Sequence, residues 1–180
     1  MLDAAVLNRY PQADCRAIQA LLKEKCREDG HKIVVLDDDP TGVQTVHDVS
    51  VYTDWSYESI KKGFEEDNKL FYILTNSRGF TVEQTTRAHL GIGENVARVS
   101  EETGIDYVIV SRGDSTLRGH YPLETELLAQ AEETYRGKPV DGEIICPYFK
   151  EGGRFTIDNV HYVKYGEQLV PAGETEFAGD

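Results

Sequence analysis

The sequence predicts an α/β fold, with a doubly wound, mostly parallel sheet and helices on both faces, as in a Rossmann-like three-layer domain. Short apolar runs rich in β-branched residues recur along the chain, such as KIVVLD at 32–37 and DYVIVS at 106–111. Longer segments of helical periodicity lie between them. Strands that alternate with helices favour right-handed crossovers and therefore a parallel sheet.

Four helices are expected from apolar faces at helical spacing or from start and stop signals. They cover residues 12–29, 56–67, 81–103 and 122–135. Thr81 and Gln84 predict a capping box at the start of the third helix, and Gly104 predicts its end. Pro122 suits the first turn of the fourth helix.

Five strands are expected from apolar runs that are too short for helices. They cover residues 32–37, 49–54, 70–75, 106–111 and 143–149. The remaining sequence, from Arg154 on, mixes a β-like stretch with glycine-rich loops. We therefore expect a helical extension over 1–30 and one α/β domain over 31–180.

The composition excludes several classes of partner. The net charge is −13 and the pI is near 4.8, which argues against binding to nucleic acid or to an anionic membrane. No apolar run approaches the roughly 20 residues of a membrane span, and the N-terminus lacks the pattern of a signal peptide. Three cysteines without CxxC spacing, Cys15, Cys26 and Cys146, favour reduced packing residues in a cytoplasmic protein.

Polar residues follow the predicted strands where ligands bind in doubly wound sheets, beyond the carboxyl ends of the strands. The four loops are DDDPTG at 37–42, NSR at 76–78, RGDSTLRG at 112–119 and KEGGR at 150–154. Loops that only connect elements are also polar and rich in glycine, so one such loop would carry little weight. Four on one predicted edge favour a binding site.

These loops offer both charges. Their arginines present planar donors for a carboxylate or phosphate. The four arginines are Arg78, Arg112, Arg118 and Arg154. Each could instead pair with a nearby aspartate, and we favour this interpretation for Arg112. Asp38, Asp39 and Asp114 could accept hydrogen bonds from sugar hydroxyls, and one could take a hydroxyl proton or hold Mg²⁺. His47, His120 and His161 form no metal motif, so no metal site is predicted.

The three consecutive aspartates are expected to differ in role. Asp37 follows Leu36 directly and should still belong to the strand. Pro40 biases Asp39 toward an extended conformation, and Gly42 allows a close approach of the backbone to a ligand. We expect Asp38 and Asp39 to face the ligand as catalytic residues, one as hydroxyl acceptor and one as base, with the two roles left open.

One interpretation is a phosphatase of the haloacid dehalogenase type. Asp37, Asp39 and Thr41 have the spacing of that superfamily's first motif, in which the first aspartate is the nucleophile, and LTNSRG at 74–79 resembles its second motif. The required downstream lysine and acidic pair are not found, since no lysine lies between Arg78 and Arg112.

A second interpretation comes from five segments: DDDPTG (37–42), TNSRG (75–79), SRGDSTLRGH (111–120), CPYFKEGGR (146–154) and ETEFAGD (174–180). In order and spacing they resemble the N-terminal domain of the four-carbon acid sugar kinases, formerly a domain of unknown function. DSTLRG is the most specific of these motifs. The resemblance begins near residue 32 and does not explain the preceding helix.

The resemblance implies that this domain binds an acid sugar, such as a threonate, erythronate or 3-oxo-tetronate, while a separate C-terminal domain binds ATP. Together with the strand-end loops, it points to one set of substrate-binding residues. They are Asp38, Asp39, Thr41, Asn76, Ser77, Arg78, Asp114, Ser115, Thr116, Arg118, Gly153 and Arg154.

Several departures from the family pattern affect what is expected. Pro40 stands where the family usually has a bulky apolar residue, and Asp37 where it often has a small one. SRGD at 111–114 replaces the more usual pattern, which has a lysine before DST. No GxxxxGK[ST] loop is present, so ATP and Mg²⁺ are expected only with the C-terminal domain. The chain is thus expected to be the substrate-binding half of a kinase and inactive alone, and a homo-oligomer is compatible with the sequence. A non-catalytic sugar-acid-binding module remains an alternative.

Overall fold

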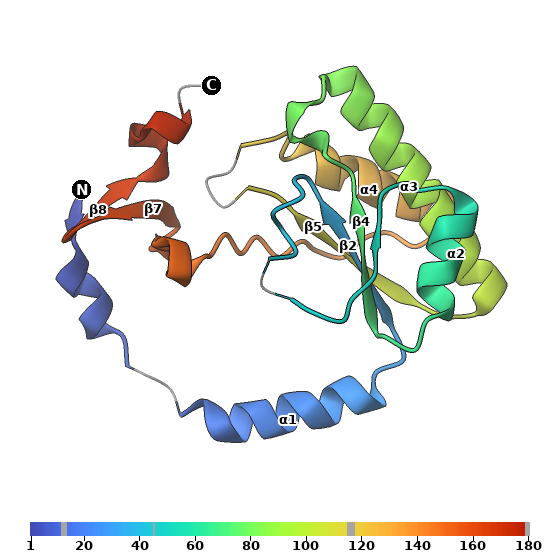
Figure 1. Cartoon of the computed structure of the whole chain (residues 1–180), viewed down its shortest axis with the longest axis horizontal. Coiled ribbons are helices and arrows are strands. Elements are labelled where there is room, and N and C mark those ends of the chain that lie inside the picture. The colour runs from blue at the N-terminus through green and yellow to red at the C-terminus, as the bar shows by residue number, and fades with distance from the viewer. Residues whose placement is uncertain (12–13, 45, 115–117, 179–180) are drawn as a thin grey trace. The chain divides into compact units, whose positions relative to one another are not determined.

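The structure is a computed structural model that describes residues 1–11, 14–44, 46–114 and 118–178 (Figure 1). Its strands are β1 (Leu2–Asp3), β2 (Lys32–Asp37), β3 (Val51–Tyr52), β4 (Leu70–Leu74), β5 (Tyr107–Arg112), β6 (Arg154–Ile157), β7 (Val160–Tyr165) and β8 (Gln168–Pro171). Its α-helices are α1 (Cys15–Glu28), α2 (Tyr57–Glu65), α3 (Val82–Thr103) and α4 (Leu123–Arg136). Short 3₁₀ helices cover Ala4–Arg9, Ser77–Gly79, Lys150–Gly152, Ala172–Glu174 and Glu176–Ala178.

The contacts divide the chain into two compact units. The parallel unit comprises His31–Asp114 and Gly119–Glu143. It holds a four-stranded sheet in the order β3-β4-β2-β5, and every neighbouring pair in it is parallel. The antiparallel unit comprises the described residues of Met1–Gly30 and Ile144–Asp180 together with Arg118. The expectation of an α/β chain with a parallel sheet is therefore confirmed.

The core of the parallel unit lies on one face of its sheet. Val34 and Leu36 of β2 pair in register with Phe71 and Ile73 of β4, and all four are buried. Residues of α2, α3 and α4 pack against this face, including Phe64, Ile92, Val96 and Leu128. On the opposite face of the edge strand β5, Val108 and Val110 are 52% and 42% exposed. Helices on both faces, as in a doubly wound sheet, are thus not confirmed.

The direction of the crossovers explains this difference. The connections β3–α2–β4 and β4–α3–β5 both run the same way across the sheet (Figure 1). Because parallel crossovers are right-handed, their helices fall on the same face. The connection from β2 to β3 runs the other way, and its helix would cover the second face. The described residues between these strands form turns and bends instead of a helix.

The local signals around α3 are reproduced in the structure. The Thr81 hydroxyl accepts from the backbone N–H of Gln84, whose side chain accepts from the N–H of Thr81. Gly104 ends the helix in the left-handed conformation, at φ 68°. The predicted capping box and stop signal are both confirmed.

The antiparallel unit holds a second four-stranded sheet, in the order β1-β8-β7-β6. The turn between β6 and β7 uses Asp158 and Asn159, both with positive φ, as two-residue hairpins require. Residues 143–149, all of which the structure describes, form no strand, so the strand predicted there is wrong. Pro147 lacks the N–H that a strand would donate, and Ile144 is 93% exposed.

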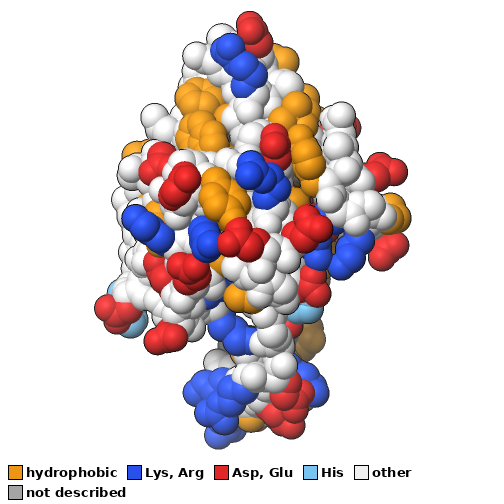
Figure 2. Space-filling model, turned by 90° about the vertical axis from the view of Figure 1, so that its right-hand side faces the viewer, with side chains coloured by type: hydrophobic (Ala, Val, Ile, Leu, Met, Phe, Trp, Pro, Cys, Tyr) orange, Lys and Arg blue, Asp and Glu red, His pale blue; other side chains and the backbone are white. Residues whose placement is uncertain are grey.

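Helix α1 confirms the predicted helix but buries no residue. Its Asp14 caps the N-terminus by accepting from the backbone N–H of Arg16. Cys15, Cys26 and Cys146 are all exposed, so the packing role expected for the cysteines is wrong. Among the described helices, none is long and apolar enough to cross a bilayer. Figure 2 shows acidic and basic side chains interspersed over the face in view.

Two glycines of α3 should respond oppositely to alanine. A Cβ on Gly93 would lie 2.4 Å from the Cβ of Ala131 on α4, whereas nothing lies within 4 Å of a Cβ on Gly91. We expect Gly93→Ala to lower the free energy of unfolding by roughly 1–3 kcal/mol through overpacking. Gly91→Ala should raise it by roughly 0.5–1 kcal/mol. Urea unfolding tests this, and equal effects would contradict the close packing of α3 on α4.

Candidate functional site

The carboxyl ends of β2, β4 and β5 meet at one edge of the parallel sheet. The backbone carbonyl of Asp37, the last residue of β2, accepts from the N–H of Thr75 after β4, at 2.9 Å. The N–H of Asp38 donates to the carbonyl of Arg112, the last residue of β5, at 3.3 Å. Three of the four loops predicted from the sequence therefore start at this edge. The fourth, residues 150–154, does not start at this edge, because no strand precedes it. It belongs to the antiparallel unit.

Arg78 links two carboxylates at this edge. Its Nε and Nη2 donate to the two oxygens of Asp38 at 3.0 and 2.9 Å, and its Nη1 donates to Asp39 at 3.0 Å. Asp114 lies 3.9 Å from Nη2. The hydrogen bond to Asp38 raises the pKa of Arg78 above its usual value, the remaining carboxylates adding to this effect against the cost of burial. Bidentate pairing of this kind fixes both distance and orientation.

Asp37 is the most enclosed of the three consecutive aspartates. Its side chain is 1% exposed, and Oδ1 accepts from Nη1 of Arg112 at 3.2 Å. Its Oδ2 is buried and has no hydrogen-bond partner among the described residues. Burial raises the pKa of the Asp37 carboxyl, an effect that the Arg112 guanidinium partly offsets. A Cβ on Gly42 would lie 2.0 Å from Oδ2, so the loop closes directly over this carboxyl group.

Asp39 is the more accessible of the two aspartates held by Arg78. Its side chain is 24% exposed, against 5% for Asp38. Its Oδ1 accepts from the backbone N–H of Thr41 at 2.8 Å and from the Thr41 hydroxyl. The hydrogen bond from the Thr41 hydroxyl is the main reason that the pKa of Asp39 lies below its usual value.

The edge thus gathers half of the substrate-binding residues predicted from the sequence. They are Asp38, Asp39, Thr41, Ser77, Arg78 and Asp114. Asn76 starts the 3₁₀ helix in the left-handed conformation and has an exposed side chain. Ser115 and Thr116 lie outside the described residues.

The other three predicted residues lie in the antiparallel unit. The guanidinium carbons of Arg118 and Arg154 lie 5.5 and 5.3 Å from the ring centroid of Phe177. The Nε of Arg154 is buried without a hydrogen-bond partner among the described residues, while Nη1 donates to the carbonyl of Gly152. Gly153 adopts a positive φ of 72° at the turn before β6. Two arginines from distant segments therefore share one aromatic ring.

Sequence reasoning missed Phe177 and a group of buried polar residues beneath the edge. Phe177 lies within the ETEFAGD segment, where only the family pattern drew attention to it. The buried group consists of Thr75, Ser77, Thr85, His89 and Glu124, of which only Ser77 was predicted. One signal was present in the sequence. Thr85 and His89 lie four residues apart on the face of α3 that also presents Ile92 and Val96.

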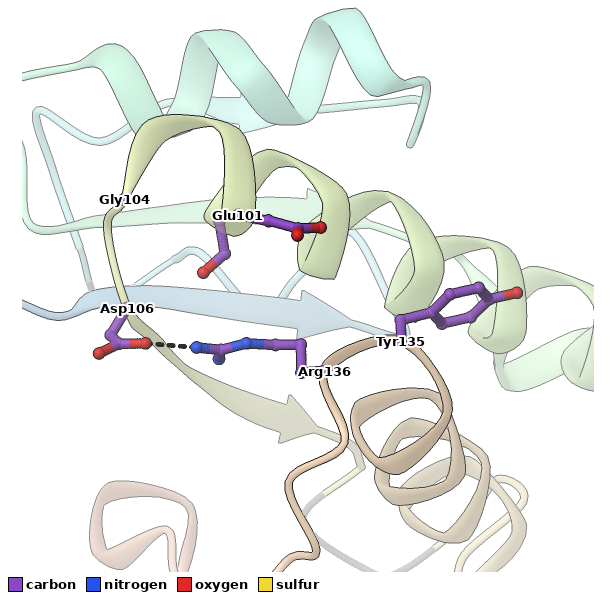
Figure 3. Close-up of a pocket in the computed structure, with 6 residues that line it drawn as sticks. Glu101, Gly104, Asp106, Tyr135 and Arg136 are labelled. Carbon is purple, nitrogen blue, oxygen red and sulfur yellow. Dashed lines mark hydrogen bonds and ion pairs between the residues drawn. The ribbon is translucent and has the colours of Figure 1, made fainter.

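A separate hollow of about 300 Å³ lies at the opposite, amino edge of β5 (Figure 3). Its lining residues come from the end of α3, the start of β5 and the end of α4. Arg136 donates to Asp106 across it, and the same guanidinium lies over the ring of Tyr107. None of the substrate-binding residues predicted from the sequence lines this hollow.

The described residues do not contain three or more His, Cys, Asp or Glu side chains arranged to hold a metal ion. At the strand edge, the two arginines occupy the positions beside the carboxylates. The chemistry available there is acceptance of hydrogen bonds by carboxylates of fixed orientation, with Asp39 within reach of a ligand.

Comparison with models of known protein families gives a match over most of the chain. Residues 33–180 match the family model described as the sugar-binding N-terminal domain, so the chain belongs to that family. No curated protein matches it. The matched range includes both the strand-edge cluster and the two arginines beside Phe177, and the resemblance noted in the sequence is confirmed.

Arg78 should contribute strongly to stability. Arg78→Ala leaves the almost buried Asp38 carboxylate without its main partner, and breaking such a pair costs about 3–5 kcal/mol. Arg78→Lys keeps the charge but loses the bidentate geometry, so its effect should be smaller. Arg87→Ala, which removes an arginine that is 70% exposed, is the control and should cost less than about 0.5 kcal/mol. Chemical unfolding of the three variants decides the question, and a cost for Arg78→Ala equal to the control would refute this role.

Asp37 and Asp39 should have opposite effects on the pH dependence of stability. The folded pKa of Asp37 is raised above 3.8, so the ionised carboxyl weakens the fold increasingly as pH rises through that value. The folded pKa of Asp39 is lowered, so its contribution is complete above 3.8 and is lost as pH falls.

Relative to the wild type, Asp37→Asn should gain stability between acid and neutral pH, whereas Asp39→Asn should lose it over the same range. Urea unfolding at several pH values measures both differences. Trends of the same sign in the two variants would contradict the assigned environments.

Proposed function

We propose that this member of the sugar-binding N-terminal domain family is the substrate-binding part of an ATP-dependent kinase that phosphorylates a four-carbon acid sugar. The ligand class is a tetronate, such as threonate, erythronate or a 3-oxo-tetronate. The observation that carries the proposal is the strand-edge cluster, in which Arg78 holds Asp38 and Asp39 beside the carboxyl ends of β2, β4 and β5.

The aspartates of this cluster suit the hydroxyl groups of a sugar acid. An ionised carboxylate is an acceptor only and offers about four lone-pair positions, so Asp39 keeps acceptor capacity beyond its bonds to Arg78 and Thr41. Its exposure makes Asp39 the carboxylate that a ligand would reach. Asp38, held on both oxygens by Arg78, then orients the guanidinium between them.

The same aspartates suit the proton transfer that a kinase requires. A hydroxyl that attacks a phosphoryl group loses its proton, and a nearby carboxylate can accept it. We assign the role of base to Asp39 and that of its partner to Asp38. ATP would supply the phosphoryl group, and Mg²⁺ would neutralise negative charge on its phosphates. The sequence has no GxxxxGK[ST] loop, so we assign the nucleotide to a separate C-terminal domain, as the family resemblance implies.

The arginines of the antiparallel unit have the charge for an anionic group. Arg118 and Arg154 both lie over the ring of Phe177, and Arg154 keeps a buried donor without a partner among the described residues. Guanidinium groups bind carboxylates in a planar, bidentate way. We include both residues, with Gly153, among those that contact the ligand.

The position of Asp37 speaks against the phosphatase interpretation. A nucleophilic aspartate must be reached by a phosphate ester, whereas Asp37 is 1% exposed and lies directly beneath Gly42. A module that binds a sugar acid without catalysis would share the proposed ligand and differ only in turnover.

Calorimetry with threonate and erythronate tests the proposal, with the neutral polyol threitol as the control ligand. We expect both acids to bind the 180-residue chain more tightly than threitol, and we expect the chain alone to consume no ATP. Absence of binding to any tetronate would overturn the assignment of the ligand. Rapid hydrolysis of a generic phosphomonoester would revive the phosphatase interpretation.

Arg118→Ala and Arg154→Ala should weaken tetronate binding. A lost hydrogen bond to a charged group costs roughly 1.5–3 kcal/mol, or about tenfold to a hundredfold in affinity. Arg98→Ala is the matched control, since this arginine also lies over an aromatic ring, that of Tyr57. Calorimetric Kd values and thermal midpoints should be measured together. If Arg118→Ala or Arg154→Ala lowers the midpoint but leaves Kd unchanged, the arginine is structural.

A further inference from the structure

We propose that Glu124 is a positioning residue that fixes Arg78, through Ser77, in the geometry that holds Asp38 and Asp39. The role in ligand binding rests on the proposed function, whereas the effect on Arg78 does not. Glu124 lies in the first turn of α4 and is buried, as are the Ser77 and His89 side chains that face it. A carboxyl group in such a place is costly unless its partners compensate it.

A continuous chain of hydroxyl contacts joins Glu124 to the strand edge. The Ser77 hydroxyl donates to Oε1 of Glu124 at 3.3 Å, and the hydroxyls of Thr75 and Ser77 lie 2.9 Å apart. The Thr75 hydroxyl donates to the backbone carbonyl of Asp37 at 2.9 Å. Two hydroxyl protons serve these three contacts, so removing one member changes the bonding of the others.

His89 lies beside Glu124 on the side of α3. Its Nδ1 lies 2.9 Å from the backbone carbonyl of Thr85, an acceptor, so this nitrogen carries a hydrogen and donates. The ring then turns Nε2 toward Oε1 of Glu124, at 3.8 Å. The carboxyl group thus lies between His89 of α3 and Ser77 in the loop after β4, and it accepts a hydrogen bond from Ser77.

Ser77 connects this chain of contacts to the loop that carries Arg78. It follows Asn76, which turns the backbone with a φ of 53°, in the left-handed region that asparagine adopts more often than most residues. Ser77 is followed directly by Arg78, whose backbone N–H donates to the carbonyl of Asp38 at 3.3 Å. The position of the Ser77 backbone therefore determines the position of the Arg78 Cα atom, from which its side chain extends.

The experiment uses Ser77→Ala, Glu124→Ala and Glu124→Gln in the full chain. Glu126→Ala is the matched control, because Glu126 lies in the same turn of α4 but is exposed. The first readout needs no ligand and is the protection of the Arg78 Nε–H from hydrogen exchange in the NMR spectrum. The second is the Kd for threonate or erythronate, and the third is the free energy of unfolding.

We expect Ser77→Ala and Glu124→Ala to lower the protection of Arg78 Nε–H and to weaken tetronate binding, each by about tenfold, as for the loss of one hydrogen bond. Glu124→Gln keeps an acceptor oxygen for Ser77 and should retain most of the protection. Glu126→Ala should change neither. If Glu124→Ala does not fold, Ser77→Ala, which deletes a single oxygen atom, decides.

Unchanged protection of Arg78 in Ser77→Ala would overturn the proposal, even if the free energy of unfolding falls. Failure of the wild-type chain to bind either tetronate would instead overturn the proposed function. The exchange measurement would still decide whether Glu124 positions Arg78.

Discussion

The parallel unit depends on the neutralisation of aspartates where its central strand ends. β2 delivers three consecutive carboxyl groups to the edge of the sheet, two of them almost fully buried. Arg78 arrives from the loop after β4 and Arg112 from the end of β5, so the two neighbouring strands supply the compensating charges. The same ion pairs therefore fix three things: the register between the strands, the conformation of two loops and the electrostatics of the candidate site. An arginine suits this role because its planar donors satisfy two oxygens at once.

The direction of the chain across the sheet explains where this cluster lies. β2 leads toward β3 in one direction, while the later crossovers return in the other direction, and the crossover from β4 to β5 passes over β2. Ligand sites in parallel sheets form where neighbouring connections diverge in this way. The same topology leaves one face of the sheet without a helix of its own unit, because the connection that would supply it consists of turns. The segment after β2 thus carries the aspartates of the candidate site and also leaves one face of the sheet without a helix.

Much of this arrangement could be predicted from the sequence, where the signals are local. The apolar run of β2, the capping box at Thr81 and the stop at Gly104 depend on a few adjacent residues, and all three were correct. The strand predicted at 143–149 failed because an apolar run does not reveal whether a partner strand is available. The sequence also placed Arg78 at the edge without showing that aspartates of this chain would occupy its donors. Glu124 was missed because its partners, Ser77 and His89, are distant from it in the sequence. The three-dimensional contacts alone distinguish a buried carboxyl group from one on a solvated helix.

The packing of Gly42 on Asp37 constrains how this family could vary. A side chain at position 42 would occupy the space of the Asp37 carboxyl group, so the two positions share a fixed volume. A relative that carries alanine or a larger residue at the position of Gly42 would need a smaller residue at the position of Asp37. Such a change would also remove the nearer of the two aspartates that pair with Arg112. Substitutions at the positions of Gly42, Asp37 and Arg112 should therefore occur together in relatives. Such covariation would indicate that the loop packs on the carboxyl group in those relatives too.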